Sequence, residues 1–294
     1  MVFSGRFSRY WPIIVVLPAL FLYILFLLLP SLGNIFFSFT DFTGNVNRPL
    51  NWIGFRNYER ALTSDFDNLG TIIKNTILFA ISVTVFQNII AVLLAVLVNM
   101  KLKLRNFYRS VIFMPNMLGV IVIGIVWVLI FDPFNGPIYL VFEKLGIESA
   151  LLGDPKLAMT LVVSVTIWSN VGYGMILYLA GLQNIPEELY EAGKIDGTSG
   201  WSAFRYITVP LLRSSITINV LICIIGTLSM YESILVLTNG GPGIATTTLG
   251  LYILKSLSTG SQGYTAALSI LHYFIVLVVV LIVQFYLRRK EADL

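Results

Sequence analysis

Six long apolar stretches constrain the fold of this chain more than any other feature of its sequence. Each is about as long as a helix must be to cross the hydrocarbon core of a bilayer, roughly 20 residues. The predicted spans are residues 11–39, 72–98, 111–131, 157–182, 211–237 and 266–287. Hydrophobic residues make up 57% of the chain and charged residues 12%, which is too apolar for a soluble domain of 294 residues. We therefore predict an all-α, polytopic membrane protein with six transmembrane helices.

The spacing of these stretches also predicts three parts of the chain. A polar segment, residues 40–70, separates the first span from the other five. The parts are a first helix with its outer loop (1–70), a five-helix core (71–288) and a short tail (289–294). The first stretch is too long for a cleaved signal sequence, so we interpret it as a retained helix. The single cysteine, Cys223, lies within span five and cannot form an intrachain disulfide.

Lysine and arginine are distributed unevenly between the two predicted sides of the membrane. Twelve of the 19 lie on the side that carries both termini: Arg6, Arg9, Lys101, Lys103, Arg105, Arg109, Lys194, Arg205, Arg213, Arg288, Arg289 and Lys290. Cytoplasmic segments of membrane proteins carry an excess of these residues. We therefore expect both termini and the loop 184–210 to face the cytoplasm. The basic residues act as a topology signal, so no nucleic-acid partner is expected.

Sequence motifs for autonomous catalysis are missing. The chain has no G-x-x-x-x-G-K-[ST] loop, no H-E-x-x-H and no C-x-x-C, and its one histidine is His272. We predict no catalytic residue, no metal site and no cofactor bound by this chain. Uphill transport of a solute would then draw its energy from an ion gradient or from another subunit.

One carboxylate, Glu232, lies within predicted span five. A carboxylate at membrane depth costs roughly 2.5–3.5 kcal/mol on insertion scales, so we expect Glu232 to face water or the interior of the helix bundle. Other polar and aromatic groups in the spans suit an uncharged, polyhydroxylated ligand, and with Glu232 they form the predicted substrate path: Gln87, Asn170, Tyr173, Tyr178, Ser229 and Tyr231. The alternative is hydrogen bonding between helices, which such side chains commonly provide in membranes.

The polar loop 184–210 is predicted to fold into two short helices. Pro186 suits a first helical turn, and Glu187 and Glu188 oppose the positive end of the helix dipole. Gly197 can adopt the left-handed conformation that ends a helix. A second helix can then start at residue 198 or 199 and run toward Pro210.

Small and apolar residues of this loop indicate a docking surface. Ala192 and Gly193 would leave room for a partner to approach closely. Four side chains offer apolar anchors: Leu189, Tyr190, Ile195 and Trp201. An ordinary cytoplasmic loop is the alternative interpretation.

The spacing of this loop resembles the EAA motif of binding-protein-dependent ABC importer permeases. That motif reads E-A-A, three residues, G, nine residues, I, one residue, L-P. The matching residues here are Glu191, Ala192, Gly193, Gly197, Ile207, Val209 and Pro210. The chain departs from the motif at Gly193 and Val209, which remain small and apolar respectively.

Further passages are similar to the carbohydrate branch of these permeases, such as maltose and glycerol-3-phosphate importers. They are Phe55-Arg56-Asn57-Tyr58, Asn75-Thr76, Thr238-Asn239-Gly240-Gly241-Pro242, residues 246–249, Tyr252 and residues 263–269. The resemblance thus covers nearly the whole chain, and it implies the type I ABC importer permease architecture in a prokaryotic plasma or inner membrane.

The resemblance implies partners and roles. A second permease would complete the pore as a heterodimer, two ATPase subunits would bind ATP and Mg, and an extracytoplasmic solute-binding protein would deliver a carbohydrate. The residues implied to couple the permease to the ATPases are Glu191, Ala192, Gly193, Asp196, Gly197 and Pro210. The outer segments 40–70, 132–156 and 239–263 would meet the solute-binding protein or cap the translocation path, and packing among the loops is the alternative.

Two rival classes remain. An ion-coupled secondary carrier would use Glu232, but it leaves the EAA-like loop unexplained, and the sequence shows no pair of broken helices in corresponding halves. A membrane-embedded enzyme would need paired carboxylates or a His-rich cluster at one membrane face. The close acidic pairs are Asp65 with Asp67 and Glu187 with Glu188, which are better explained as solvated surface or a helix start.

Overall fold

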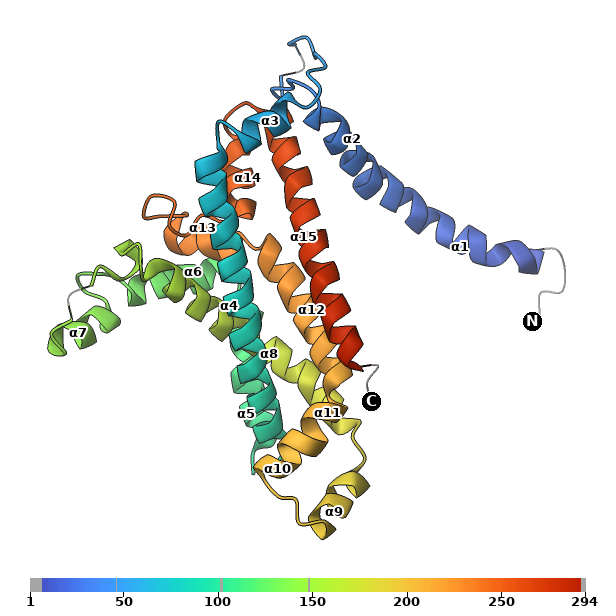
Figure 1. Ribbon diagram of the computed structural model, residues 1–294, viewed down its shortest axis with the longest axis vertical. Coiled ribbons are helices and arrows are strands. Elements are labelled where there is room, and N and C mark those ends of the chain that lie inside the picture. The colour runs from blue at the N-terminus through green and yellow to red at the C-terminus, as the bar shows by residue number, and fades with distance from the viewer. Residues whose placement is uncertain (1–6, 46, 101–102, 148, 292–294) are drawn as a thin grey trace. The chain divides into compact units, whose positions relative to one another are not determined.

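The computed structural model describes residues 7–45, 47–100, 103–147 and 149–291, which form helices joined by loops (Figure 1). Within these ranges the one β feature is an isolated bridge between Thr40 and Trp52. The predicted all-α class is therefore confirmed. Arg6 and Lys101 of the orientation argument, and residues 292–294 of the predicted tail, lie outside the described residues.

The long helices are α4 (Phe66–Asn99), α8 (Ala158–Gln183) and α15 (Gln262–Glu291). The other helical elements are α1 (Phe7–Tyr23), η1 (Ile24–Leu28), α2 (Leu29–Ser38), α3 (Arg56–Leu62), α5 (Arg105–Phe113), η2 (Met114–Met117), α6 (Val120–Ile130), α7 (Pro137–Lys144), η3 (Leu151–Gly153), α9 (Glu187–Ile195), α10 (Trp201–Ala203), η4 (Phe204–Thr208), α11 (Val209–Leu211), α12 (Arg213–Ser229), α13 (Glu232–Thr238) and α14 (Leu249–Leu257).

These elements fall into two compact units. The first comprises the chain up to Phe66 together with Ile253–Tyr273, and the second comprises Asp67–Tyr252 and the chain from Phe274 onward. Every residue of the candidate site described below belongs to the second unit.

Four described helices are long and apolar enough to cross a membrane: Val15–Ser38, Phe66–Asn99, Ala158–Gln183 and Gln262–Arg289. The number rises to six if each of two bent helix pairs is one span. One pair, Arg105–Met117 with Val120–Ile130, bends by 95°, and the other, Trp201–Leu211 with Arg213–Ser229, bends by 70°.

Two predicted spans are therefore not continuous helices. Span 111–131 is interrupted at Leu118 and Gly119, whose extended backbone has ψ values of 143° and 140°. Span 211–237 is interrupted after Ser229, because Met230 is extended with ψ 132° and α13 begins only at Glu232. The expectation that each of these two stretches is a single helix is therefore corrected. Apolar composition alone does not show where a helix breaks.

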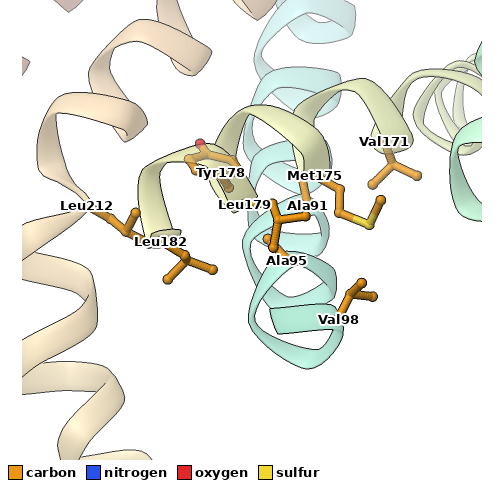
Figure 2. Close-up of a cluster of buried hydrophobic side chains, with 9 residues drawn as sticks. All are labelled: Ala91, Ala95, Val98, Val171, Met175, Tyr178, Leu179, Leu182 and Leu212. Carbon is orange, nitrogen blue, oxygen red and sulfur yellow. The ribbon is translucent and has the colours of Figure 1, made fainter. Parts of the chain in front are cut away.

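Helix α4 supplies one side of the core through a stripe of buried residues at helical spacing. Small residues on that stripe, Ala91 and Ala95, let α8 come close, and a Cβ placed on Gly174 would lie 3.1 Å from the Cβ of Ala91. Figure 2 shows the buried cluster where α4, α8 and Leu212 meet: Ala91, Ala95, Val98, Val171, Met175, Tyr178, Leu179, Leu182 and Leu212.

Polar contacts organise the first unit. The Arg60 guanidinium lies 4.1 Å from the ring centroid of Tyr264 and forms an ion pair with Asp65, and the Tyr264 hydroxyl donates to Asp65 Oδ2 at 2.6 Å. In the neighbouring loop, the side chain and backbone N–H of Asn51 both donate to Asp41. These hydrogen bonds to the charged form lower the pKa of Asp41 below its ordinary value.

Candidate functional site

A small cavity of mixed polar and apolar lining lies where both helix interruptions meet α8. Its volume is about 90 Å³, and it is lined by Pro115, Asn116, Leu118, Val120, Ile123, Gly124, Val165, Ser169, Asn170, Met230, Glu232, Ser233 and Leu237. These residues come from η2, α6, α8, α13 and the two extended connections. A break in a membrane helix leaves backbone groups without helical partners, and in transporters such breaks are found beside water-filled cavities and solute sites.

Amide side chains form a network on one side of this cavity. Asn116 Nδ2 donates to Asn170 Oδ1 at 3.4 Å, and Gln87 Nε2 donates to the Asn170 carbonyl at 3.5 Å. The Asn170 amide in turn donates to the Thr166 carbonyl at 2.9 Å and to Ser169 Oγ at 3.0 Å. Asn116 of η2 and two residues of α8 thus hold the Asn170 amide at the wall, while Gln87 of α4 contacts its backbone.

Glu232 contributes the carboxylate of the cavity. It is the first residue of α13 and is solvent-exposed, and a negative charge at a helix start is favourable. α13 packs against α6, where Val236 occupies the space beside Gly124 that a larger residue would need. The contact between the two short helices therefore determines where Glu232 lies.

The predicted path residues divide into two groups. Asn170 and Glu232 line the cavity, and Gln87 contacts Asn170. The others lie outside its lining: Tyr173, Tyr178, Ser229 and Tyr231. Sequence reasoning placed Asn116 and Gly124 in a plain apolar span. The Pro115-Asn116 pair inside that stretch was the signal that could have revealed them, since proline removes a helical donor.

Tyr178 belongs to the packed core. Its ring is fully buried in the cluster of Figure 2, and its hydroxyl donates to Asn88 Oδ1 at 2.5 Å. Asn88 in turn donates to the Thr84 carbonyl at 2.7 Å. This is the helix-to-helix hydrogen bonding that the sequence left open as the alternative to substrate contact.

Replacing Tyr178 with Phe is expected to lower the thermal stability of the chain. The change leaves the buried Asn88 oxygen without its donor, at a cost of about 1–3 kcal/mol. Tyr173→Phe on the same helix is the matched control, because Tyr173 is 43% exposed. Melting of the detergent-solubilised chain checks this. An unchanged melting temperature in Tyr178→Phe would contradict the core role.

The loop 184–210 forms a second candidate region. Helix α9 spans nine residues, with Glu187 and Glu188 in its first turn, and Gly197 follows it with φ +80°. The next helix starts at Trp201 rather than at residue 198 or 199. Gly197 has no described heavy atom within 4 Å of an added Cβ, so its requirement for glycine comes from backbone conformation.

Gly193 lies inside this loop fold. It is buried, and a Cβ on it would lie 2.6 Å from both Ile207 Cδ1 and Thr198 Oγ1. A second contact between the same elements joins the Tyr190 and Thr208 hydroxyls at 3.0 Å. The small residue therefore makes room for Ile207 of its own chain, and α9 and η4 pack as a pair.

The opposite side of the loop is open. Glu191, Ala192 and Asp196 are exposed, whereas Pro210 is half-buried. The apolar side chains of Leu189, Ile195 and Trp201 are 42%, 87% and 69% exposed. Ordinary loops expose single apolar residues, but several in one short stretch are typical of a docking surface. The described residues contain no cluster of three or more His, Cys, Asp or Glu that could hold a metal ion.

Comparisons of sequence place this chain among transport proteins. The family model described as "binding-protein-dependent transport system inner membrane component" matches residues 87–292. A probable ABC transporter permease of Pyrococcus horikoshii is 32% identical over 273 residues, covering 92% of each chain. The trehalose/maltose transport system permease MalF of Thermococcus litoralis is 32% identical over 266 residues, covering 90% of this chain and 89% of that one. The arabinooligosaccharides transport system permease AraP of Bacillus subtilis is 33% identical over 278 residues, covering 92% and 86%.

Solved structures show the same fold. A chain from the crystal structure of a bacterial ABC transporter involved in the import of the acidic polysaccharide alginate aligns with a TM-score of 0.83 and 23% identity. The alignment covers 96% of this chain and 97% of that one. A second structure, of an alginate transporter in complex with an alginate pentasaccharide-bound periplasmic protein, aligns with a TM-score of 0.83.

Proposed function

Because this chain belongs to the family of binding-protein-dependent transport system inner membrane components, we propose that it is the permease subunit of an ATP-driven importer for a carbohydrate. The observation that carries the proposal is the family match over residues 87–292. Relatives named for trehalose/maltose and arabinooligosaccharides support a sugar as the solute. The amides and hydroxyls of the cavity suit such a solute, because they can both donate and accept hydrogen bonds.

In this proposal the chain crosses a prokaryotic plasma or inner membrane six times, with one crossing in each of the two bent regions. Both termini and the loop 184–210 face the cytoplasm. The first helix with its outer loop (1–70), the core (71–288) and the tail (289–294) keep the division expected from sequence. The partners are a second permease, two ATPase subunits that bind ATP and Mg, and an extracytoplasmic solute-binding protein.

The loop transmits ATPase movement to the membrane helices. Glu191, Ala192 and Asp196 contact the ATPase from the exposed side of α9, while Gly193 and Gly197 shape the loop from within. Pro210 lies where the loop joins α12. A packed helix pair moves as one body, whereas a mobile loop would dissipate the displacement. The contacts of Gly193 with Ile207 and of Tyr190 with Thr208 support this rigidity.

The cavity is part of the solute path. Asn116, Asn170 and Glu232 are the polar groups that a hydroxylated solute would meet there. Its volume of about 90 Å³ is too small for a sugar, because ligand sites usually enclose about 300 Å³ or more. Movement of α6 relative to α13 would widen it, which fits the alternation between closed and open states that an importer requires.

Affinity purification of the chain from its native membrane tests the proposal. We expect a second permease and an ATPase to copurify, and the reconstituted complex to take up radiolabelled maltose, trehalose or lactose only with ATP and the solute-binding protein. Recovery of the chain alone, with uptake that needs no ATP, would reject the importer.

Glu232→Gln separates the importer from the ion-coupled carrier. In the importer Glu232 is an exposed carboxylate of the path, and the interactions of exposed charged groups are worth about 1 kcal/mol or less. Uptake is therefore expected to fall by less than about tenfold and to remain ATP-dependent. The measurement is uptake into proteoliposomes with and without an imposed proton or sodium gradient. A gradient dependence that disappears in the variant would support the carrier instead.

A further inference from the structure

Three consecutive threonines, Thr246–Thr248, follow the loop after α13 and are almost completely buried. Each hydroxyl reaches a different backbone carbonyl. Thr247 Oγ1 donates to Gly240 at 3.0 Å, and Thr246 Oγ1 donates to Gly241 at 2.9 Å and lies 2.7 Å from Thr238 Oγ1. The first two threonines therefore hold the C-terminal end of α13.

The third threonine holds the other end of the same helix. Thr248 Oγ1 donates to the Met230 carbonyl at 3.4 Å. Met230 is the extended residue at the break between α12 and α13, where helical hydrogen bonding is lost. Gly250 lies against the same break, since a Cβ there would lie 3.2 Å from the Ser229 carbonyl oxygen. A backbone carbonyl at a break in a membrane helix needs a donor, and Thr248 supplies one.

The threonine segment is itself fixed to α4. The Leu249 N–H donates to Thr76 Oγ1 at 2.8 Å. Asn75 Nδ2 donates to the carbonyls of Ile244 at 2.9 Å and Thr247 at 3.3 Å. One short segment thus ties both ends of α13 to the longest helix of the fold.

The position of α13 determines the shape of this cavity. Glu232, Ser233 and Leu237 of α13 line one wall, and the facing wall includes Ile123 and Gly124 of α6. Because the two helices pack directly on each other, a shift of α13 changes the space between these walls. None of the three threonines lines the cavity itself.

We propose that Thr248 is a positioning residue. Its hydroxyl fixes the Met230 carbonyl at the helix break, and its segment is anchored on α4, so that α13 and the wall of the solute cavity keep their position. The proposal rests on the cavity being part of the solute path. It gives a role to the Asn75-Thr76 pair and to residues 246–249, which take no part in the proposed coupling to the ATPases. Thr248 acts through α13 and makes no contact with the solute.

The test measures the cavity directly in the full chain in its native membrane. A cysteine is introduced by Ser233→Cys in a Cys223→Ser background, and its modification by methanethiosulfonate ethylammonium is timed. Thr248→Val removes the hydroxyl at nearly constant volume and is expected to change the modification rate by at least about threefold. Thr248→Ser keeps the hydroxyl and should restore the original rate. Thr71→Val is the matched control, because Thr71 is exposed and its hydroxyl bonds only within α4.

A second variant keeps the proposal falsifiable if Thr248→Val does not accumulate. Asn75→Ala releases the anchor on α4 without touching α13 and should change the rate in the same direction. An unchanged rate in Thr248→Val, or in Asn75→Ala if only that variant accumulates, would overturn the positioning role.

Uptake measurements separate this inference from the proposed function. In the reconstituted importer Thr248→Val is expected to raise the maltose, trehalose or lactose concentration for half-maximal uptake by about fivefold, with ATP hydrolysis in the absence of solute unchanged. The labelling experiment needs neither ATP nor sugar. If Thr248→Val changes the labelling rate while the wild-type complex moves no sugar, the importer is rejected and the positioning role stays supported.

Discussion

Gly193→Val is expected to reduce solute uptake by about a hundredfold while the chain still inserts into the membrane. The valine Cβ would overlap Ile207 Cδ1 and Thr198 Oγ1, each 2.6 Å away, and its branched methyl groups cannot avoid both. α9 must then move away from η4, so the surface offered to an ATPase is displaced. The measurement is ATP-dependent uptake in proteoliposomes, with membrane insertion followed by protease protection.

Two companion variants identify the cause. Gly193→Ala should retain more uptake than Gly193→Val, because its single methyl meets only two side-chain tips, Ile207 Cδ1 and Thr198 Oγ1, and has no branches. Alanine also occupies this place in the motif that the loop resembles. Adding Ile207→Ala to Gly193→Val should recover part of the activity by making room. If the double variant stays inactive while Gly193→Ala is also inactive, the small residue serves a contact with the partner rather than packing within the loop.

Gly172→Val is expected to destabilise the chain by about 3 kcal/mol. A Cβ on Gly172 would lie 2.5 Å from the Ile112 carbonyl oxygen and 2.7 Å from Phe113 Cα. These are backbone atoms, so the overlap is relieved only if α8 and α5 separate. Separation would also pull Asn170 away from Asn116 and break the amide network of the cavity. Melting of the solubilised chain, with solute binding measured below the transition, follows both effects.

Gly70→Val is the control for this change, because no described heavy atom lies within 4 Å of an added Cβ at Gly70. It should melt close to the wild-type temperature. Equal melting temperatures for Gly172→Val and Gly70→Val would show that α8 and α5 do not approach as closely as described.

The sequence predicts much of this fold because long apolar stretches have few alternatives to membrane helices. α4, α8 and α15 follow this rule, and the family resemblance drawn from the EAA spacing is confirmed by the family match. The interruptions at Leu118 and Met230 were not predictable in the same way. Both occur inside predicted membrane spans, and the donor that supports the second is Thr248, which lies in another predicted segment.

Individual roles were harder to assign than helices. Tyr178 carries the same chemical groups as a residue that binds sugar, but its partner Asn88 is 90 positions away in sequence and only the fold brings them together. Gly193 shows the same limit, since its small size is explained by Ile207 in a different helix. The coupling roles of the loop and the substrate path both stay predictions.

The short length of α6 has a consequence for the insertion of this chain into the membrane during synthesis. Eleven residues rise about 16 Å, roughly half the hydrocarbon thickness, so α6 does not span a bilayer by itself. Its packing partner α13 is synthesised about a hundred residues later. During that interval the nascent chain carries a half-length apolar helix with free backbone groups at its start. We therefore expect α6 to reach its final packing only after the second half of the chain has been inserted.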